Sequence, residues 1–285
     1  MRITNHHNFP APVVNALTMY EQGGEKVSGL RVTTLIGSPR VSVLRRKYSQ
    51  HLEEDVSDLV FRVFGSAVHK IFEDAADNSS VSEERLSVNV GGVPLTGAID
   101  YQFVSDDGVD IKDYKTCKAF KITKGDYSDW ENQLNVYSFL VRHAKHLSVS
   151  SLSVIAIIKD WSLEGTRRNA DYPAAALQEI SIPLWSPDKQ DSYVQDRVRL
   201  HQRASFDELP ECTDEERWYV PGKFALHKRG RKRAIGLYDS HADAEFHRNG
   251  DSDLYIEERK GFSRKCTDYC NVAPFCSQFQ KEEGA

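Results

Sequence analysis

The chain lacks a long apolar run, which limits where it can act. None of its segments approaches the roughly 18–20 consecutive apolar residues that a membrane-spanning helix needs. The first residues, Met1–His7, contain no apolar stretch of the kind that defines a secretory signal. We therefore expect a soluble, cytoplasmic protein that has no membrane partner.

Positive charge is not in excess either. The formal net charge of the 285-residue chain is −5, so the molecule as a whole does not attract polyanions. Contacts with nucleic acid would have to come from local basic patches. The sequence has no Gly-x4-Gly-Lys-Ser/Thr phosphate loop, which excludes a helicase motor on this chain. It also has no internal repeat and no long low-complexity segment.

Cysteine is sparse, and the five cysteines do not indicate a disulfide framework. Their number is odd, and a cytoplasmic chain keeps its thiols reduced. Three of them form the cluster Cys266-x3-Cys270-x5-Cys276, and thiols this close in such a chain usually hold a metal. The set is incomplete, so Cys212 is the candidate for a fourth ligand, and Cys117 is interpreted as a bystander. The alternative is a group of reduced structural cysteines.

The periodicity of apolar residues predicts a mixed α/β fold. Apolar residues at helical spacing predict helices over 56–76 and 130–146. Between these helices, short β-prone segments separated by glycine-containing turns predict an antiparallel meander. The strands expected in it are 85–90, 93–103 and 109–115.

The composition changes after Ala204, where an acidic, proline-containing segment begins. We therefore predict two parts. Residues 1–205 form the α/β core with an N-terminal helical region. Residues 206–285 form a small C-terminal cysteine module with a basic hairpin.

The strand over 109–115 carries the residues with the clearest chemistry. Side chains alternate along a strand, so Asp113 and Lys115 project to one face and Asp110 to the other, where we expect it to be dispensable. The meander brings Asp100 onto the neighbouring strand. Because Mg²⁺ prefers oxygen ligands, two aspartates and the backbone carbonyl of Tyr114 suffice to hold it.

Two further residue types complete a hydrolytic centre. His69, on the preceding helix, adds a nitrogen ligand that favours Mn²⁺. Lys115 can orient the attacking water and favour its hydroxide form. Glu73, one helical turn after His69, is either a solvated residue or a partner that orients His69. Together these residues predict metal-dependent hydrolysis of phosphodiester bonds.

Four short motifs, in this order, resemble the RecB-type branch of the PD-(D/E)XK nuclease superfamily, which includes CRISPR-associated exonuclease-like and phage nucleases. The resemblance covers roughly residues 30–205. One departure is that Ile99, not proline, precedes Asp100. The motifs are Gly65-Ser66-Ala67-Val68-His69, Gly97-Ala98-Ile99-Asp100, Asp113-Tyr114-Lys115-Thr116 and Gln133-Leu134-Asn135-Val136-Tyr137.

The resemblance implies a restriction-endonuclease-like core, with a central mixed sheet flanked by helices. It implies that Gln133 and Tyr137 hold Lys115 and the substrate strand, although Tyr137 could equally be a core residue and Gln133 its polar neighbour. The implied metal ligands are His69, Asp100, Asp113 and Tyr114. The implied catalytic residues are Asp100, Asp113, Lys115, Gln133 and Tyr137.

The function implied is that of a Mg²⁺/Mn²⁺-dependent DNA exonuclease that acts on single- or double-stranded linear ends. Its setting would be phage or mobile-element recombination and repair in the cytoplasm of a bacterial or phage-infected cell. A single-strand annealing or helicase protein is the expected partner. The alternatives are a structure-directed endonuclease of the same fold and a non-catalytic, metal-cluster DNA-binding protein.

The resemblance also concerns the cysteines, because members of this branch often carry a [4Fe-4S] cluster. Its ligands are three C-terminal cysteines and one that precedes the nuclease core. This sequence departs from that pattern: Ser38-Pro39-Arg40 stands roughly where the early cysteine would be, and three residues, not two, separate Cys266 from Cys270. Cys212 would then be the fourth ligand. We expect a [4Fe-4S] cluster, with Zn²⁺ as the alternative.

A basic hairpin turn is the candidate DNA-binding patch, with Trp218 and Tyr219 beside it as candidates for base stacking. The alternatives are that the charged turn only maintains solubility and that the aromatic residues only pack in the core. The residues assigned to DNA binding are Arg40, Lys228, Arg229, Arg231, Lys232 and Arg233.

Overall fold

The computed structural model describes residues 1–22, 29–76 and 80–284. Two compact units are present: Met1–Pro39 with Glu53–Glu208, and Arg40–Leu52 with Leu209–Ala285. The structure differs from the predicted division in the segment 40–52, which the sequence placed in the core. This segment belongs to the second unit because its apolar residues, including Leu44 and Leu52, pack in a cluster with residues near the C-terminus.

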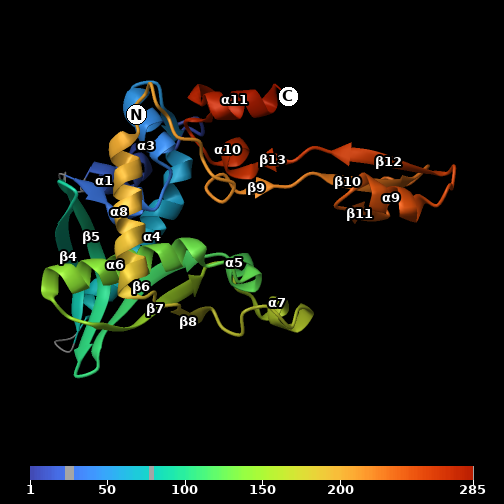
Figure 1. Cartoon of the computed structure of the whole chain (residues 1–285). Helices are drawn as coiled ribbons and strands as arrows, with labels where there is room; N and C mark the ends of the chain where they lie inside the picture. The colour runs from blue at the N-terminus through green and yellow to red at the C-terminus, as the bar shows by residue number, and fades with distance from the viewer. Residues whose placement is uncertain (23–28, 77–79, 285) are drawn as a thin grey trace. The chain divides into compact units, whose positions relative to one another are not determined.

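The first unit is built on a mixed six-stranded sheet, so the predicted fold class is confirmed. The β4, β5 and β6 strands form the expected antiparallel meander, β7 runs parallel to β6, and β8 returns antiparallel to β7. The short strand β2 adds to β5 in parallel. Figure 1 shows its long strands in colours that run from teal (β4 and β5) to olive (β7 and β8). The strands are β2 Leu30–Arg31, β4 Val81–Val90, β5 Val93–Ser105, β6 Gly108–Cys117, β7 Val149–Ile158 and β8 Leu177–Ile182.

Helices flank the sheet, and α6 packs against β4, β5, β6 and β7 (Figure 1). The predicted helix over 56–76 consists of a 3-10 turn, η1, followed by α4. Within the described ranges, no helix is long and apolar enough to cross a bilayer. A separate parallel pair joins β1 Arg2–Thr4 to β3 Glu53–Asp55. The helices are α1 Ala11–Gln22, α2 Val32–Leu35, η1 Val56–Leu59, α4 Val60–Asp74, α5 Ala119–Lys124, α6 Ser128–Lys145, α7 Leu163–Arg168 and α8 Pro187–Arg203.

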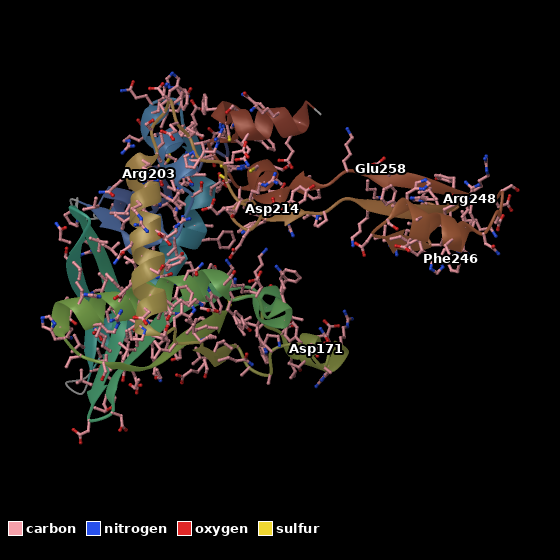
Figure 2. All side chains as sticks on the ribbon, in the orientation of Figure 1. Asp171, Arg203, Asp214, Phe246, Arg248 and Glu258 are labelled. Carbon is pink, nitrogen blue, oxygen red and sulfur yellow. The ribbon has the colours of Figure 1, made fainter. Side chains whose placement is uncertain are left out.

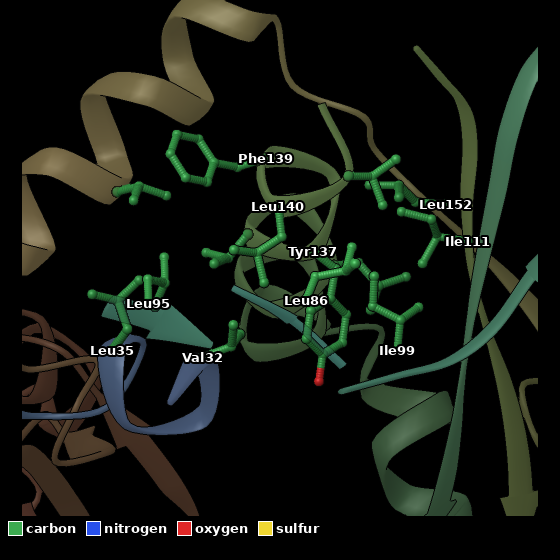
Figure 3. Close-up of a cluster of buried hydrophobic side chains, with 14 of the residues drawn as sticks. Val32, Leu35, Leu86, Leu95, Ile99, Ile111, Tyr137, Phe139, Leu140 and Leu152 are labelled. Carbon is green, nitrogen blue, oxygen red and sulfur yellow. The ribbon is translucent and has the colours of Figure 1, made fainter. Parts of the chain in front are cut away.

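The core of the first unit lies between the sheet and α6, and it fixes the position of the motif residues. Figure 3 shows Tyr137 among these buried side chains, close to Ile99. A side chain at Gly97 would collide with this packing: its Cβ would lie 2.7 Å from Tyr137 Cε1 and 2.9 Å from Val32 Cγ2. Gly97 therefore permits the close approach of α6 to β5, which brings Tyr137 toward the strand that carries Asp100.

The second unit consists of short elements with small cores. A three-stranded antiparallel sheet has β10 at its centre, between β11 and β12. Ala225, Leu226 and Ala244 are buried at that sheet and at α9. The elements are α3 Pro39–Lys47, β9 Tyr219–Val220, β10 Lys223–Lys228, β11 Gly236–Tyr238, α9 His241–Arg248, β12 Leu254–Arg259, β13 Phe262–Ser263, α10 Arg264–Asp268, η2 Ala273–Phe275 and α11 Ser277–Glu283.

Candidate metal centre

The candidate centre lies where two neighbouring strands separate. The β5–β6 ladder runs from the pair Ser105–Gly108 to the pair Tyr101–Lys112 and ends there, while β6 continues along β7 to Cys117. The next residue on β5 is Asp100, and the next on β6 is Asp113. Both carboxylates are almost fully buried, at 6% and 1% exposure. The sheet thus holds two acids side by side at a point where backbone groups are no longer paired between their strands.

Asp113 and Lys115 lie on the same face of β6, as their spacing predicts. The Lys115 ammonium is 2.5 Å from Asp113 Oδ2. Burial raises the pKa of Asp113 to about 6, although the charge of Lys115 opposes this shift. Burial lowers the pKa of Lys115, but the carboxylate outweighs it and the net shift is upward. Lys115 is therefore held as an ammonium ion against the buried acid.

Gln133 and Tyr137 on α6 reach the same face. The amide nitrogen of Gln133 donates to Asp113 Oδ1 at 3.2 Å and to the Tyr137 hydroxyl at 2.8 Å. The resemblance implied that this pair holds Lys115; the described contacts of Gln133 are with Asp113 instead, so that implication needs correction. Tyr137 is 4% exposed, and burial raises its pKa, so it serves both as a core residue and as an anchor for Gln133.

On the other side of Asp100, His69 and Glu83 complete a set of three ligand atoms within 4.8 Å of one another. His69 Nδ1 lies 3.3 Å from Asp100 Oδ1 and 3.7 Å from Glu83 Oε1. Hydrogen bonds to these two carboxylates raise the pKa of His69 to about 10. Without a metal ion, a protonated imidazole therefore offsets part of the negative charge of the two acids.

Glu83 is a residue that the sequence analysis missed. It lies in β4 with a φ of 51°, a left-handed conformation that is uncommon in a strand. Its neighbours Ser82 and Glu84 pair with Tyr101 and Ile99, which places Glu83 opposite Asp100. Counting outward from the predicted glycine turn gives the same register. The residue was overlooked because the strand was expected to begin at Arg85.

Tyr114 contributes through its backbone. Its N–H donates to Asp100 Oδ2 at 2.7 Å. Because the N–H and C=O of a strand residue point to the same edge, the carbonyl of Tyr114 also faces Asp100 and lies outside the β6–β7 ladder. This is the position that a third oxygen ligand requires. The ring stacks on Phe72 at 4.6 Å and meets His69 edge-on, which fixes the imidazole from the side.

Two other acids lie apart from the centre. Glu73 pairs with Lys70 at 3.1 Å and does not contact His69, so the orienting role considered for it is not seen. Asp110 accepts hydrogen bonds from Ser150 and Ser151 on β7. Its contacts therefore agree with its predicted position on the opposite face from Asp113.

The donor set fits a hard divalent cation. Oxygen atoms of Asp100, Asp113 and Glu83, one imidazole and one backbone carbonyl are the ligand types that Mg²⁺ and Mn²⁺ take. The two perturbed groups point the same way: burial raises the pKa of Asp113, so a nearby cation would favour its ionised form, and the proton on His69 occupies a cation's place. A metal ion would replace that proton and stabilise the ionised acids.

The four C-terminal cysteines come from two separate segments of the second unit. Burial, with the nearby thiols of Cys270, Cys212 and Cys276, raises the pKa of Cys266 to about 11. Gln278 on α11 makes two hydrogen bonds to the backbone of Cys212. Its side-chain oxygen accepts from the Cys212 N–H at 2.8 Å, and its side-chain nitrogen donates to the Cys212 C=O at 3.0 Å. Cys276 and Cys270 pack in the apolar cluster of Leu44 and Val272.

The spacing of these sulfur atoms bears on the metal. No three of the four lie within 4.8 Å of one another in the described part of the chain. Around a single Zn²⁺, Zn–S bonds of about 2.3 Å place tetrahedral sulfurs roughly 3.8 Å apart. A polynuclear cluster inserts its own atoms between its ligands, so its thiolates stand farther apart. In the described residues the four sulfur atoms therefore do not form a closed tetrahedral zinc site.

Arg40 does not face solvent, so its predicted role in DNA binding is wrong. It is 4% exposed and lies at the start of α3. Its Nε donates to Cys276 Sγ at 3.1 Å and a terminal nitrogen donates to Ser277 Oγ at 2.7 Å. The other terminal nitrogen donates to the carbonyls of Leu209 and Pro210, both at 3.3 Å. Sequence charge alone could not reveal this burial, because α3 is embedded by residues far along the chain.

The basic hairpin turn is fully exposed at all five predicted positions, and no carboxylate of the described residues pairs with its side chains. It connects β10 to β11. Phe246, on α9 of the same sheet module, is 80% exposed (Figure 2). Trp218 is 50% exposed, with Tyr269 and Lys265 against its ring. A role in DNA binding stays a prediction for this surface.

Comparison with known proteins identifies no family. No family model matches the chain, and no curated protein matches it. Among solved structures, one described as the crystal structure of SSO0001 is similar, with 15% sequence identity and a TM-score of 0.45. The match covers 67% of this chain and 85% of that one.

Proposed function

We propose that the first unit is a Mg²⁺/Mn²⁺-dependent nuclease that hydrolyses phosphodiester bonds of DNA, as an exonuclease of the RecB-like type. The observation that carries this proposal is the buried contact between Asp113 and Lys115, beside Asp100 at the separation of β5 and β6. A buried ion pair is costly to maintain for stability alone. Placed next to a second acid and a histidine, it has the composition of a hydrolytic centre.

Each residue has a distinct task in this proposal. Asp100, Asp113, Glu83 and His69, with the carbonyl of Tyr114, would hold the cation, which would activate water and stabilise charge on the phosphate and leaving oxygen when bound. Asp113 positions the Lys115 ammonium, which orients the water. Gln133 fixes the second oxygen of Asp113, and Tyr137 fixes Gln133. The water attacks phosphorus, and the P–O bond to the leaving oxygen breaks.

Matched variants on the same strand test the proposal. We expect Asp113→Asn and Lys115→Ala to lower the Mn²⁺-dependent degradation of linear DNA at least about a thousandfold, since removing one member of an interdependent centre removes most of its effect. Asp110→Asn and Lys112→Ala remove the same charges from β6 outside the centre and should retain activity. Thermal unfolding would confirm that all four variants fold. Full activity in either centre variant overturns the proposal.

Two alternatives are separated by the substrate. An exonuclease leaves circular single-stranded DNA intact, whereas a structure-directed endonuclease cuts it. A non-catalytic DNA-binding protein would bind DNA but would degrade no form of it, and calorimetry would show no Mn²⁺ binding. The biological setting we propose is phage or mobile-element recombination, beside a single-strand annealing or helicase partner.

For the second unit we propose a [4Fe-4S] cluster held by Cys212, Cys266, Cys270 and Cys276, with Zn²⁺ as the alternative. The support is the convergence of four thiols from two segments and their separation in the described structure. Such a centre would join the segment around Cys212 to the helices near the C-terminus. Iron, zinc and acid-labile sulfide content of anaerobically purified protein distinguishes the two metals. Absence of all three would overturn the proposal.

A further inference from the structure

A buried arginine beside a cysteine sulfur is a feature of the second unit that neither the nuclease centre nor DNA binding explains. Arg40 uses all three of its guanidinium nitrogens. Their acceptors are the sulfur of Cys276, the hydroxyl of Ser277 and two backbone carbonyls. Every acceptor other than the sulfur is neutral. Throughout the described ranges, no carboxylate pairs with this guanidinium.

This arrangement leaves a charge to be accounted for. Arginine stays protonated in proteins, and a buried cation without an anion costs far more than the hydrogen bonds to neutral groups return. Among its hydrogen-bond partners in the described residues, the one that can carry negative charge is the sulfur at 3.1 Å. Four thiolates outweigh the two positive charges of Zn²⁺, and they likewise outweigh the charge of an oxidised [4Fe-4S] core. A metal centre on the cysteines would therefore supply the missing anion.

We propose that Arg40 is a positioning residue of the cysteine centre: it compensates the net negative charge and orients Cys276 by a hydrogen bond to the ligand sulfur. The inference rests on the proposed cysteine centre and is independent of the nuclease activity. Hydrogen bonds to thiolate ligands and nearby charge are known controls on the stability and reduction potential of such centres. Arg40 acts through Cys276 and touches no substrate.

The same contacts explain why the segment 40–52 belongs to the second unit. Arg40 lies in the first turn of α3, where it contacts Cys276. Tyr48, just after the last turn, stacks on Phe275 with ring centroids 4.3 Å apart. Leu44, between them, is 1% exposed in the apolar cluster that includes Cys276. The hydrogen bond to the cysteine sulfur and the apolar contacts thus lie on the same face of α3. Loss of the metal would leave α3 with a buried, uncompensated cation at its first turn.

The test compares Arg40→Gln and Arg40→Lys with the control Arg45→Gln. Arg45 lies on the same helix, is exposed and, among the described residues, donates to Asn271. The measurement is the rate at which the anaerobically purified full chain releases iron or zinc to a chelator. We expect Arg40→Gln to speed release about 10–100-fold. Arg40→Lys keeps the positive charge but loses the planar guanidinium, so its release rate should lie between those of wild type and Arg40→Gln. The release rate of Arg45→Gln should match that of wild type.

A second readout separates this role from ordinary packing. Arg40→Gln should unfold at a lower temperature than wild type when metal is bound, and at an equal or higher temperature once the metal has been removed, because the uncompensated charge is then gone. If the bound metal is an iron–sulfur cluster, the variant should also have a lower reduction potential, since a nearby cation favours the reduced state.

Each outcome decides the inference. Unchanged release and potential in Arg40→Gln overturn it while the cysteine centre stands. Equal destabilisation with and without metal also overturns it, because that pattern indicates packing alone. A wild-type chain that holds neither iron nor zinc overturns the centre and the inference together. If Arg40→Gln does not accumulate as folded protein, the release rate of Arg40→Lys decides, and a rate equal to wild type counts against the inference.

Discussion

The two units gather metal-binding residue types in opposite ways. In the first, oxygen and nitrogen donors lie on long strands and a long helix, and each charge has a partner within the unit, as in the contacts of Lys115 with Asp113 and of His69 with Asp100. In the second, the sulfur donors lie on or between short elements, beside a buried arginine that has no carboxylate partner among the described residues. The acids of the first set thus have cationic partners without a metal ion, whereas the arginine of the second set has no anionic partner without one.

This difference teaches what a metal would do in each place. A centre whose acids already contact positively charged side chains can take up and lose its cation without a change of fold, as a catalytic ion requires. A centre that leaves a cation uncompensated needs its metal as part of the structure. Without a metal, the region around α3 and the C-terminal cysteines would be held mainly by the small apolar cluster of Leu44, Leu52, Val272 and Cys276. The units should therefore respond differently to the same treatments.

Metal removal should have the largest effect, and on one unit alone. An iron or zinc chelator should abolish hydrogen-exchange protection of residues 40–52 and 264–284, because the charge of Arg40 is then uncompensated. Protection of β5, β6 and α6 should stay unchanged. Exchange measured by mass spectrometry at the level of peptides tests this. Equal loss of protection in both units would remove the distinction between a structural and an exchangeable metal.

The pH dependence of Mn²⁺ affinity sharpens the comparison for the first unit. Because the pKa of His69 is raised to about 10, Mn²⁺ must displace a proton below that pH. The dissociation constant should fall about tenfold for each unit between about pH 7 and about pH 8.5. Calorimetry in two buffers of different ionisation enthalpy would count the released proton. His69→Asn should bind more weakly and with little dependence on pH, whereas a steep dependence in that variant would contradict the assignment.

The same shift fixes the sign of the stability change in the metal-free protein. The pKa of His69 rises on folding from 6.5 to about 10. The protonated histidine therefore stabilises the fold fully below pH 6.5, and this contribution is lost as the pH rises through about 10.

The smallest predicted effect concerns Glu83. Glu83→Gln removes one of the three ligand groups within 4.8 Å but keeps its shape, so we expect Mn²⁺ affinity to fall about tenfold. Glu84→Gln is the matched control, since Glu84 binds Lys145 and Gln102 away from the centre. Mn²⁺ titrations of both variants give the comparison. Equal affinities in the two variants would remove Glu83 from the ligand set.

The residues of the candidate centre were predictable because local rules control their placement. Alternation along β6 separated Asp113 from Asp110, and a helical spacing of four residues joined Gln133 to Tyr137. The glycine turn also set the register that places Glu83 opposite Asp100, but the expected strand began two residues too late to include it. What the pattern could not supply is the left-handed φ at Glu83.

Arg40 and its helix show the limit of the same reasoning. A short helix with four basic residues is typical of a surface that binds polyanions. Contacts with residues 169 to 237 positions later bury one of the four. Long-range partners of this kind leave no periodic signal in the sequence. The predicted boundary of the C-terminal module missed the segment 40–52 for the same reason.

The placement of the segment 40–52 in the second unit has a consequence for folding during synthesis. The chain leaves the first unit after Pro39, returns to it at Glu53 and leaves it again after Glu208. At ribosomal speeds of roughly 5–20 residues per second, α3 emerges on the order of ten seconds or more before Cys266 is synthesised. A truncated product ending after Glu208 would keep Arg40 and Leu44 without the residues that cover them. Because α3 packs against residues near the C-terminus, the molecule cannot fold fully until the segment that carries the last cysteines has been synthesised.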